Sequence, residues 1–391
     1  MLYALRSALF LRFQRPAAMP LAEELALPKG HIPALDAIRG LAIVLVTLYR
    51  FGGGDHGAGR AVEADWLVEP GSRGVDLFFV LSGFLITGIL FDAKGKDYYF
   101  RNFYVRRSLR IFPLYYGVLV ATIFLLPALF PATRAMFQPA IDHQAWLWLY
   151  GANVFQSWNA GWCLGALNHF WSLAVEEHFY LAWPLVIFCC NRTTAMRICL
   201  ALVAASALGR AAWLACGGNS VAVEVLTPFR MDGLALGAWI ALAARGGNGL
   251  GWLVRFAHPV ALLSGLAAGG LWLADKRLMG LPFTAWACLC GSLLILTIAA
   301  RPGTLLGRFG QSRVLQFFGK YSYAMYVFQN PLIPLMAGVF SAPAVAALVG
   351  HAWLGQAIYC AAMFGLTTLV ALVSWQCFEK HWLALKGRFG G

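Results

Sequence analysis

Charged residues are scarce in this chain of 391 amino acids. Asp, Glu, Lys and Arg together make up 12% of it, about half the share found in an average soluble domain. Apolar runs of about twenty residues recur along the chain instead, and this is the length that an α-helix needs to cross a bilayer. The two features together exclude an ordinary soluble domain and predict an integral membrane protein.

Metal-binding patterns and internal repeats are also missing from the sequence. The nine cysteines include no CxxC pair, and no Cys/His spacing is typical of a zinc site, so we expect no metal cofactor. The absence of a repeat argues against an inverted-repeat transporter, although charged residues inside spans would also suit ion coupling. A net charge of +13 would suit nucleic acid in a soluble protein. Here Lys and Arg gather in short loops between apolar runs, and this distribution sets the orientation of a membrane protein in the bilayer. We therefore expect no nucleic-acid role.

The hydropathy pattern predicts an all-α polytopic transmembrane bundle of about ten helices with a central polar cavity. The stretch 143–157 is apolar but short, so a re-entrant or interfacial helix is expected there rather than a further span. The expected spans are 34–51, 74–92, 111–130, 169–190, 196–215, 229–244, 257–274, 282–300, 319–340 and 354–378.

The distribution of basic residues predicts the orientation. Most Lys and Arg outside the spans fall on the side that holds the 93–110 loop and both termini, and the positive-inside rule places that side in the cytoplasm. The expected organisation is a cytoplasmic N-terminal tail at 1–33, a membrane domain at 34–380 in the inner membrane, and a cytoplasmic C-terminal tail at 381–391. The oligomeric state is not specified by the sequence.

The first span carries two arginines, Arg39 and Arg50. Eleven steps of 100° end about 20° past three full turns, so both arginines lie on one helical face. Asp36 stands three residues before Arg39 and can pair with it. A charge at the bilayer centre costs at least ~2.5 kcal/mol, so this face is predicted to line a polar cavity. The alternative is that the two arginines extend to the two membrane interfaces.

A second polar face is predicted in the span at 169–190. His169, Ser172, Glu176 and Tyr180 follow the spacing of one side of a helix, and Glu177 lies beside them. A histidine near a carboxylate is suited to accept a proton as a general base. The alternative is that the glutamates form salt bridges with arginines of other spans.

A third group of charges, Arg106, Arg107 and Arg110, stands where a cytoplasmic helix enters the membrane. Clustered guanidinium groups are suited to phosphates, because their planar forks bind two oxygens at once. The alternative is a membrane anchor that contacts lipid headgroups.

Two further span starts carry acidic residues. Asp76 is expected to cap or pair, and the mid-span Ser82-Gly83 is expected to allow close helix contact. Arg230 and Asp232 are interpreted as a local pair.

Six stretches together resemble the acyltransferase family 3 membrane proteins, in order and spacing, over about residues 33 to 380. The resemblance implies a ten-helix core that takes an acyl group, expected to be acetyl, from cytoplasmic acyl-CoA as co-substrate. It also implies delivery of that group to a hydroxyl of a glycan or lipid-linked sugar. The stretches are LDAIRGLAIVLVTLYRF, GVDLFFVLSGFLIT, FYVRRSLRIFPLYY, HFWSLAVEEHFYLAWP, FRMDGLALGA and GKYSYAMYVFQNP.

The resemblance assigns roles to individual residues. Arg39 matches the arginine of the family's Arg-x10-His motif. Arg107 and Arg110 match its Arg-x-x-Arg motif, which is thought to hold the CoA phosphates. Glu176 and Glu177 match the paired acids that follow a Trp-Ser-Leu segment.

One departure from the family pattern falls on the expected general base. The family's histidine is Arg50 here, and arginine stays protonated, so it can stabilise an oxyanion or hold an anion but cannot accept a proton. His169, which matches a histidine often found two residues before the family's tryptophan, is therefore predicted as the base, backed by Glu176. The alternative is a catalytically silent member that binds or translocates an acylated sugar.

Overall fold

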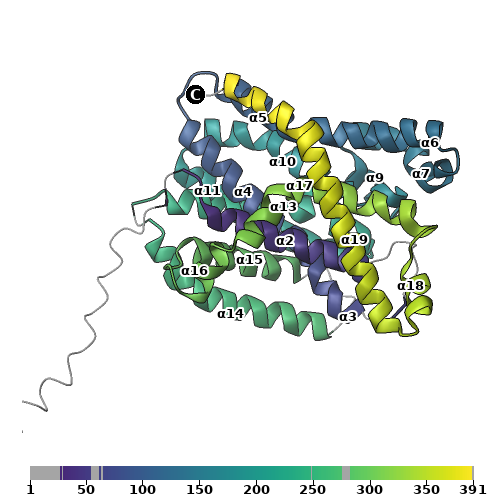
Figure 1. The fold of residues 1–391 in the computed structure, drawn as a ribbon. Coiled ribbons are helices and arrows are strands. Elements are labelled where there is room, and N and C mark those ends of the chain that lie inside the picture. The colour runs from purple at the N-terminus through teal and green to yellow at the C-terminus, as the bar shows by residue number, and fades with distance from the viewer. Residues whose placement is uncertain are drawn as a thin grey trace, which may run out of the picture.

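The computed structural model describes residues 27–28, 30–53, 61–62, 65–247, 249–274 and 282–389, and every regular element in these ranges is helical. Most of the predicted N-terminal tail, residues 1–26 and 29, lies outside the described residues. The all-α bundle predicted from hydropathy is therefore confirmed (Figure 1).

Each predicted span coincides with a long helix, because uninterrupted apolar runs favour helices that satisfy their own backbone hydrogen bonds. The long helices are α2 (Pro33–Gly52), α4 (Gly74–Ala93), α5 (Tyr99–Val120), α10 (Phe170–Cys189), α11 (Arg192–Ala215), α13 (Thr227–Ala244), α14 (Gly251–Ala274), α15 (Pro282–Ile298), α17 (Arg313–Ala337) and α19 (Ala352–Ser374).

Short elements connect the long helices. Two short helices, α8 and α9, occupy the stretch at 143–157, so it is not a span, as predicted. The short helices are α3 (Asp65–Val68), α6 (Leu126–Leu129), α7 (Thr133–Asp142), α8 (Gln144–Trp148), α9 (Ala152–Trp158), α12 (Ser220–Val225), α16 (Leu305–Gly310), α18 (Ala342–Val349) and α20 (Lys380–Ala384). The 3-10 turns are η1 (Glu69–Arg73), η3 (Gly165–Leu167) and η6 (Leu385–Phe389), and the π-turns are η2 (Ala121–Leu125) and η5 (Trp375–Glu379).

The number of ten membrane crossings is not confirmed. Within the described residues, six helices are long and apolar enough to cross a membrane, or seven if α17 and α18, bent by 58°, form one span. Helices α2 and α10 are not among the six, and these two carry Arg39, Arg50, Glu176 and Glu177. Helix α15 is shorter, with 17 residues.

The interior of the bundle is built on close helix pairs. Helix α2 packs along α17, and α4 packs along α13. A Cβ atom added to Gly40 of α2 would lie 1.9 Å from the carbonyl oxygen of Leu315, and one added to Gly83 of α4 would lie 1.9 Å from that of Leu234. Small residues thus bring these backbones together, as predicted for Ser82-Gly83.

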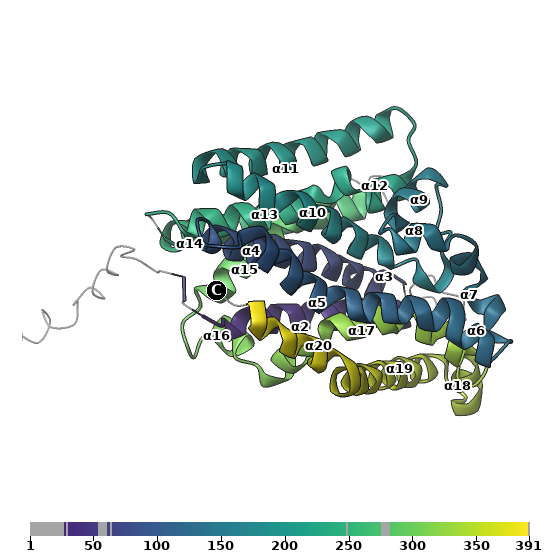
Figure 2. The same cartoon turned by 90° about the horizontal axis from the view of Figure 1, so that it is seen from above.

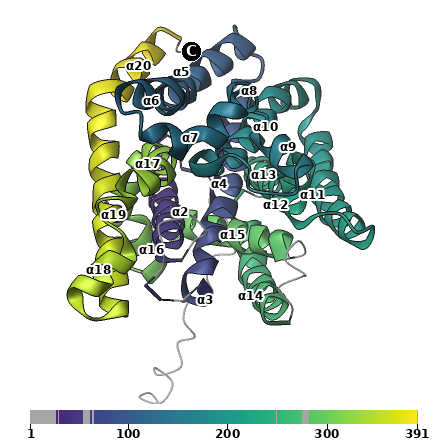
Figure 3. The ribbon, with the colours of Figure 1, turned by 90° about the vertical axis from the view of Figure 1, so that its right-hand side faces the viewer.

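The remaining long helices surround this interior. Figure 2 shows α11 at one edge of the bundle and α19 at the opposite edge, with α2, α4 and α17 between them. Figure 3 shows α14 on the outside as well, and these three outer helices bury only a minor part of their surface. The C-terminal η6 packs against α5. The central helices α2, α4 and α17 therefore lie inside the bundle, where the outer helices cover them.

Candidate active site

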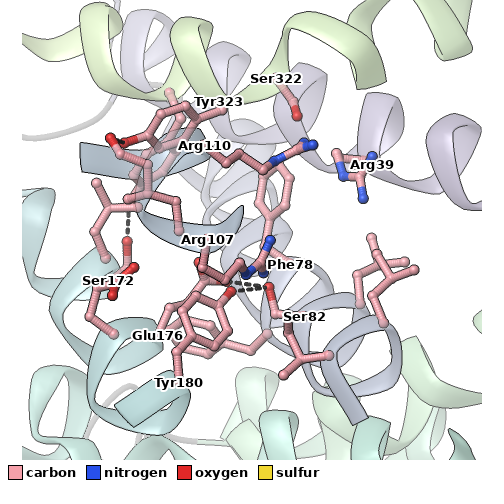
Figure 4. Close-up of a pocket in the computed structure, with 18 of the residues that line it drawn as sticks. Arg39, Phe78, Ser82, Arg107, Arg110, Ser172, Glu176, Tyr180, Ser322 and Tyr323 are labelled. Carbon is pink, nitrogen blue, oxygen red and sulfur yellow. Dashed lines mark hydrogen bonds between the residues drawn. The ribbon is translucent and has the colours of Figure 1, made fainter. Parts of the chain in front are cut away.

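A cavity of about 280 Å³ lies among α2, α4, α5, α10 and α17. Five of the eight predicted site residues line it, so the predicted central polar cavity is present (Figure 4). Its polar lining consists of Arg39 from α2, Ser82 from α4, Arg107 and Arg110 from α5, Ser172, Glu176, Glu177 and Tyr180 from α10, and Ser322, Tyr323 and Tyr326 from α17.

A chain of hydrogen bonds crosses the cavity wall from α10 to α4. The Ser82 hydroxyl donates to Oε1 of Glu176 at 2.5 Å, and the Tyr180 hydroxyl donates to Ser82 Oγ at 3.1 Å. The guanidinium carbon of Arg107 lies 4.4 Å from the centre of the Tyr180 ring, which is a cation–π contact. Glu176 is close enough to Arg107 and Arg39 for their charges to interact. The carboxylate is thus held by a hydroxyl and faces cations.

Arg39 is oriented by its own helix, as the sequence predicted. Its Nη1 donates to Oδ1 of Asp36 at 2.6 Å, and Oδ2 of Asp36 lies 2.6 Å from Nε2 of His31. The charge of Arg39 also acts on Arg107 and Arg110. Figure 4 shows the guanidinium groups of Arg39 and Arg110 near each other and that of Arg107 beside Ser82. Three arginines and two glutamates line the cavity, which therefore suits an anionic ligand.

Arg50 is not among the cavity-lining residues. It stands in the last turn of α2, with its guanidinium carbon 5.4 Å from the centre of the Tyr49 ring. Ile43 and Val46, both buried, occupy the same helical face between Arg39 and Arg50. The predicted polar face of α2 therefore reaches the cavity only at its Arg39 end.

His169 also lies outside the lining. It is fully buried at the start of α10, with Nε2 3.3 Å from the carbonyl oxygen of Val327. The hydroxyl of Tyr326 lines the cavity next to it, donating to the His169 carbonyl at 3.0 Å and lying 2.5 Å from Ser172 Oγ. Tyr326 is also near enough to Arg50 for that charge to act on its hydroxyl. His169 and Arg50 thus both adjoin Tyr326, and neither lines the cavity.

Arg106 is exposed on α5 and does not line the cavity. A basic residue that the sequence analysis missed lies nearby: Lys386 of η6, on which the charges of Arg110, Arg107 and Arg106 act. Lys386 lies in the predicted C-terminal tail. It is close to the arginines only because η6 packs against α5.

A separate group of buried ion pairs lies among α4, α11 and α13. Arg230 donates to Oδ1 of Asp76 at 2.5 Å, and Arg210 donates to Oδ2 of Asp232 at 2.8 Å. Thr284 of α15 donates to the same Asp232 oxygen at 2.8 Å. The local Arg230–Asp232 pair interpreted from the sequence is therefore wrong. Residues two apart on a helix point to different sides, and each finds a partner on another helix.

The comparison with known families settles the class of the chain. Residues 32–375 match the family model of an acyltransferase domain, Acyl_transf_3. The chain belongs to this family. The resemblance noted in the sequence is thereby confirmed, and the cavity belongs to a membrane acyltransferase domain.

Two curated relatives show how far this likeness extends. The chain is 26% identical over 339 residues to the peptidoglycan O-acetyltransferase OatA of Listeria monocytogenes, over 80% of this chain and 51% of that protein. It is 27% identical over 328 residues to the O-acetyltransferase OatA of Staphylococcus aureus, over 78% and 51% respectively. The chain thus spans about half the length of these relatives. No solved structure matches it.

Proposed function

We propose that this protein is an integral membrane O-acyltransferase that moves an acetyl group from cytoplasmic acyl-CoA to a hydroxyl of a cell-envelope glycan or its lipid-linked precursor. The observation that carries the proposal is the meeting of Arg39, Arg107, Arg110 and Glu176 in one cavity inside a membrane acyltransferase domain. The names of the relatives support O-acetyl transfer, and one of them names peptidoglycan. They lend no support to the alternative of a catalytically silent sugar binder.

The donor is assigned to the α5 side of the cavity. Arg107 and Arg110 line it, while Arg106 and Lys386 stand close to them. Guanidinium forks bind phosphate oxygens in pairs, so these groups suit the phosphates of CoA, with the thioester end inside the cavity. The concentration of Lys and Arg on this side supports a cytoplasmic entrance and an inner-membrane location with both termini in the cytoplasm.

Acyl transfer from a thioester to an alcohol needs a proton acceptor and a group that stabilises the oxyanion. We assign proton transfer to Glu176, with Glu177 beside it, because both carboxylates line the cavity. Arg39 and Arg107, whose charges act on Glu176, are placed to stabilise the oxyanion. His169 is the competing base, placed behind Tyr326.

Arg50 carries a guanidinium group, which is suited to binding an anion. Because it adjoins Tyr326 at the end of α2 opposite Arg39, we assign it to holding an anionic group of the acceptor.

The experiment is acetyl transfer by the purified protein in lipid nanodiscs, from radiolabelled acetyl-CoA to peptidoglycan fragments and lipid-linked precursors. Mass spectrometry of envelope glycans with and without the protein identifies the acceptor in cells. Loss of transfer in Glu176→Gln with retention in His169→Ala supports Glu176 as the base, and the opposite result supports His169. Absence of a labelled glycan from every acceptor and from the cells would reject acyl transfer to glycans.

A further inference from the structure

Ser82 differs from the other hydroxyl groups that line the cavity. The hydroxyl of Ser82 donates to a carboxylate, whereas those of Ser172, Ser322, Tyr323 and Tyr326 donate to a backbone carbonyl or adjoin another hydroxyl. The Tyr180 hydroxyl belongs to the same network as Ser82, because it donates to Ser82 Oγ and is close enough to Glu176 to hydrogen-bond with it. Ser172 contacts the Tyr326 hydroxyl and donates to the His169 carbonyl. Ser322 donates to the carbonyl of Gly319, Tyr323 to that of Ile111, and Tyr326 to that of His169. A hydroxyl within hydrogen-bond reach of a base is the arrangement that activates a serine nucleophile.

We propose that Ser82 is a nucleophile that carries the acyl group as an ester between donor and acceptor. This inference rests on the proposed function, because it requires a thioester donor in the cavity.

In the first half of the reaction, groups that line the cavity accept and return the proton that is transferred. Ser82 Oγ attacks the carbonyl carbon of the thioester while Glu176 takes the Ser82 proton. The carbon–sulfur bond then breaks, and the departing CoA thiolate takes that proton from Glu176. The positive charges of Arg39 and Arg107, which act on Glu176, stabilise the oxyanion that forms in between.

The second half reverses these roles. The acceptor hydroxyl attacks the ester carbon and gives its proton to Glu176. The bond between Ser82 Oγ and the acyl carbon breaks, and the proton returns from Glu176 to Ser82. The Tyr180 hydroxyl, which donates to Ser82 Oγ at 3.1 Å, stabilises the departing alkoxide. No oxidant, reductant or metal ion is needed.

The surroundings of Ser82 hold it in place for this role. Ser82 lies near the middle of α4, and its neighbour Gly83 is in close backbone contact with Leu234 of α13. Arg107 holds the Tyr180 ring through a cation–π contact. A covalent intermediate also removes the need for donor and acceptor to share a cavity of about 280 Å³, because CoA leaves before the acceptor binds.

The test is isotope exchange without an acceptor. Purified protein is given acetyl-CoA and radiolabelled CoA, and label entering acetyl-CoA reports reversible acylation of the enzyme. Peptide mass spectrometry after acid quenching then locates the added acetyl group. We expect exchange in the wild type, an acetyl group on Ser82, and a loss of exchange of about a thousandfold or more in Ser82→Ala. Ser264→Ala is the matched control, because Ser264 lies on α14 outside the cavity lining and its hydroxyl donates only to backbone carbonyls.

Several outcomes would overturn the assignment. They are an acetyl group on another residue, unchanged exchange in Ser82→Ala, or acetyl transfer to glycan without exchange, which would mean direct transfer. Exchange on Ser82 without transfer to any glycan would instead reject the proposed acceptor and keep Ser82, and absence of both activities would reject both proposals. Ser82→Cys guards against a folding defect, since it is expected to form a thioester adduct at the same position if the site is intact.

Discussion

The ion pairs among α4, α11 and α13 and the cavity beside them hold buried charges in different ways. Arg230 and Arg210 each bond one carboxylate, and the four side chains are at most 6% exposed. In the cavity, Arg107 and Arg110 form no ion pair within the described part of the chain, and Glu176 accepts from Ser82. Buried charges that are paired with each other are structural, whereas charges that line a cavity are suited to a ligand.

The largest expected effect is the loss of protein stability when one member of a structural ion pair is removed. Asp76→Ala leaves Arg230 buried without its carboxylate, which is expected to lower the free energy of unfolding by about 3–5 kcal/mol. Thermal unfolding of the detergent-solubilised protein measures the change. The double variant Asp76→Leu, Arg230→Met removes both charges and should recover much of the loss. A single variant that melts like the wild type would contradict the structural role of the pair.

Glu176→Gln tests whether the charges that line the cavity act in catalysis. The amide keeps an oxygen for the Ser82 hydrogen bond but cannot take a proton, so acetyl transfer should fall by about 10²–10⁴-fold. The melting temperature should stay close to that of the wild type, and Asp97→Asn, on an exposed residue, is the control for a lost surface carboxylate. Destabilisation as large as that of Asp76→Ala would instead place Glu176 among the structural charges.

The arginines of α5 allow a comparison within one helix. Arg107→Ala and Arg110→Ala should each weaken acyl-CoA binding by about 1.5–3 kcal/mol, roughly ten- to a hundredfold in KM. Arg106→Ala, on an exposed residue that does not line the cavity, should change KM much less. The measurement is repeated with S-acetyl-pantetheine, which lacks the nucleotide phosphates, and the effect on KM should then largely disappear, while Arg107→Ala keeps a lower kcat from the lost oxyanion stabilisation. Equal losses with both donors would show that the arginines do not bind those phosphates.

The sequence predicts the helices and the existence of the cavity for simple physical reasons. Long apolar runs define helices, and charges inside such runs must face something polar. Arg39 and Glu176 were predicted on this ground, and both line the cavity. The number of crossings could not be fixed in the same way, because the charges that reveal the cavity also lower the hydropathy of α2 and α10.

The sequence alone does not predict which side chains pair between helices, because helical periodicity gives the face of a residue but not the helix that packs against it. Arg230 bonds Asp76, 154 positions earlier in the chain, and not Asp232, two residues away. From the sequence, Ser82 is interpreted as a small residue that allows close helix packing, and the structure confirms this. Only the fold shows that Glu176 of α10 lies next to its hydroxyl.

The smallest expected effect concerns Arg50, where the family's Arg-x10-His motif has its histidine. A histidine there would titrate near pH 6.5, yet Arg50 lies beyond the cavity lining. Arg50→His should therefore change kcat for acetyl transfer by less than about threefold, which corresponds to under ~0.7 kcal/mol, whereas the loss of the guanidinium group should raise KM for an anionic acceptor. It should also add no new step to the rate between pH 6 and 8. A tenfold gain with a step near pH 6.5 would move the reaction centre toward Arg50 and favour a silent native protein, because the new imidazole would then be the proton acceptor that Glu176 is proposed to be.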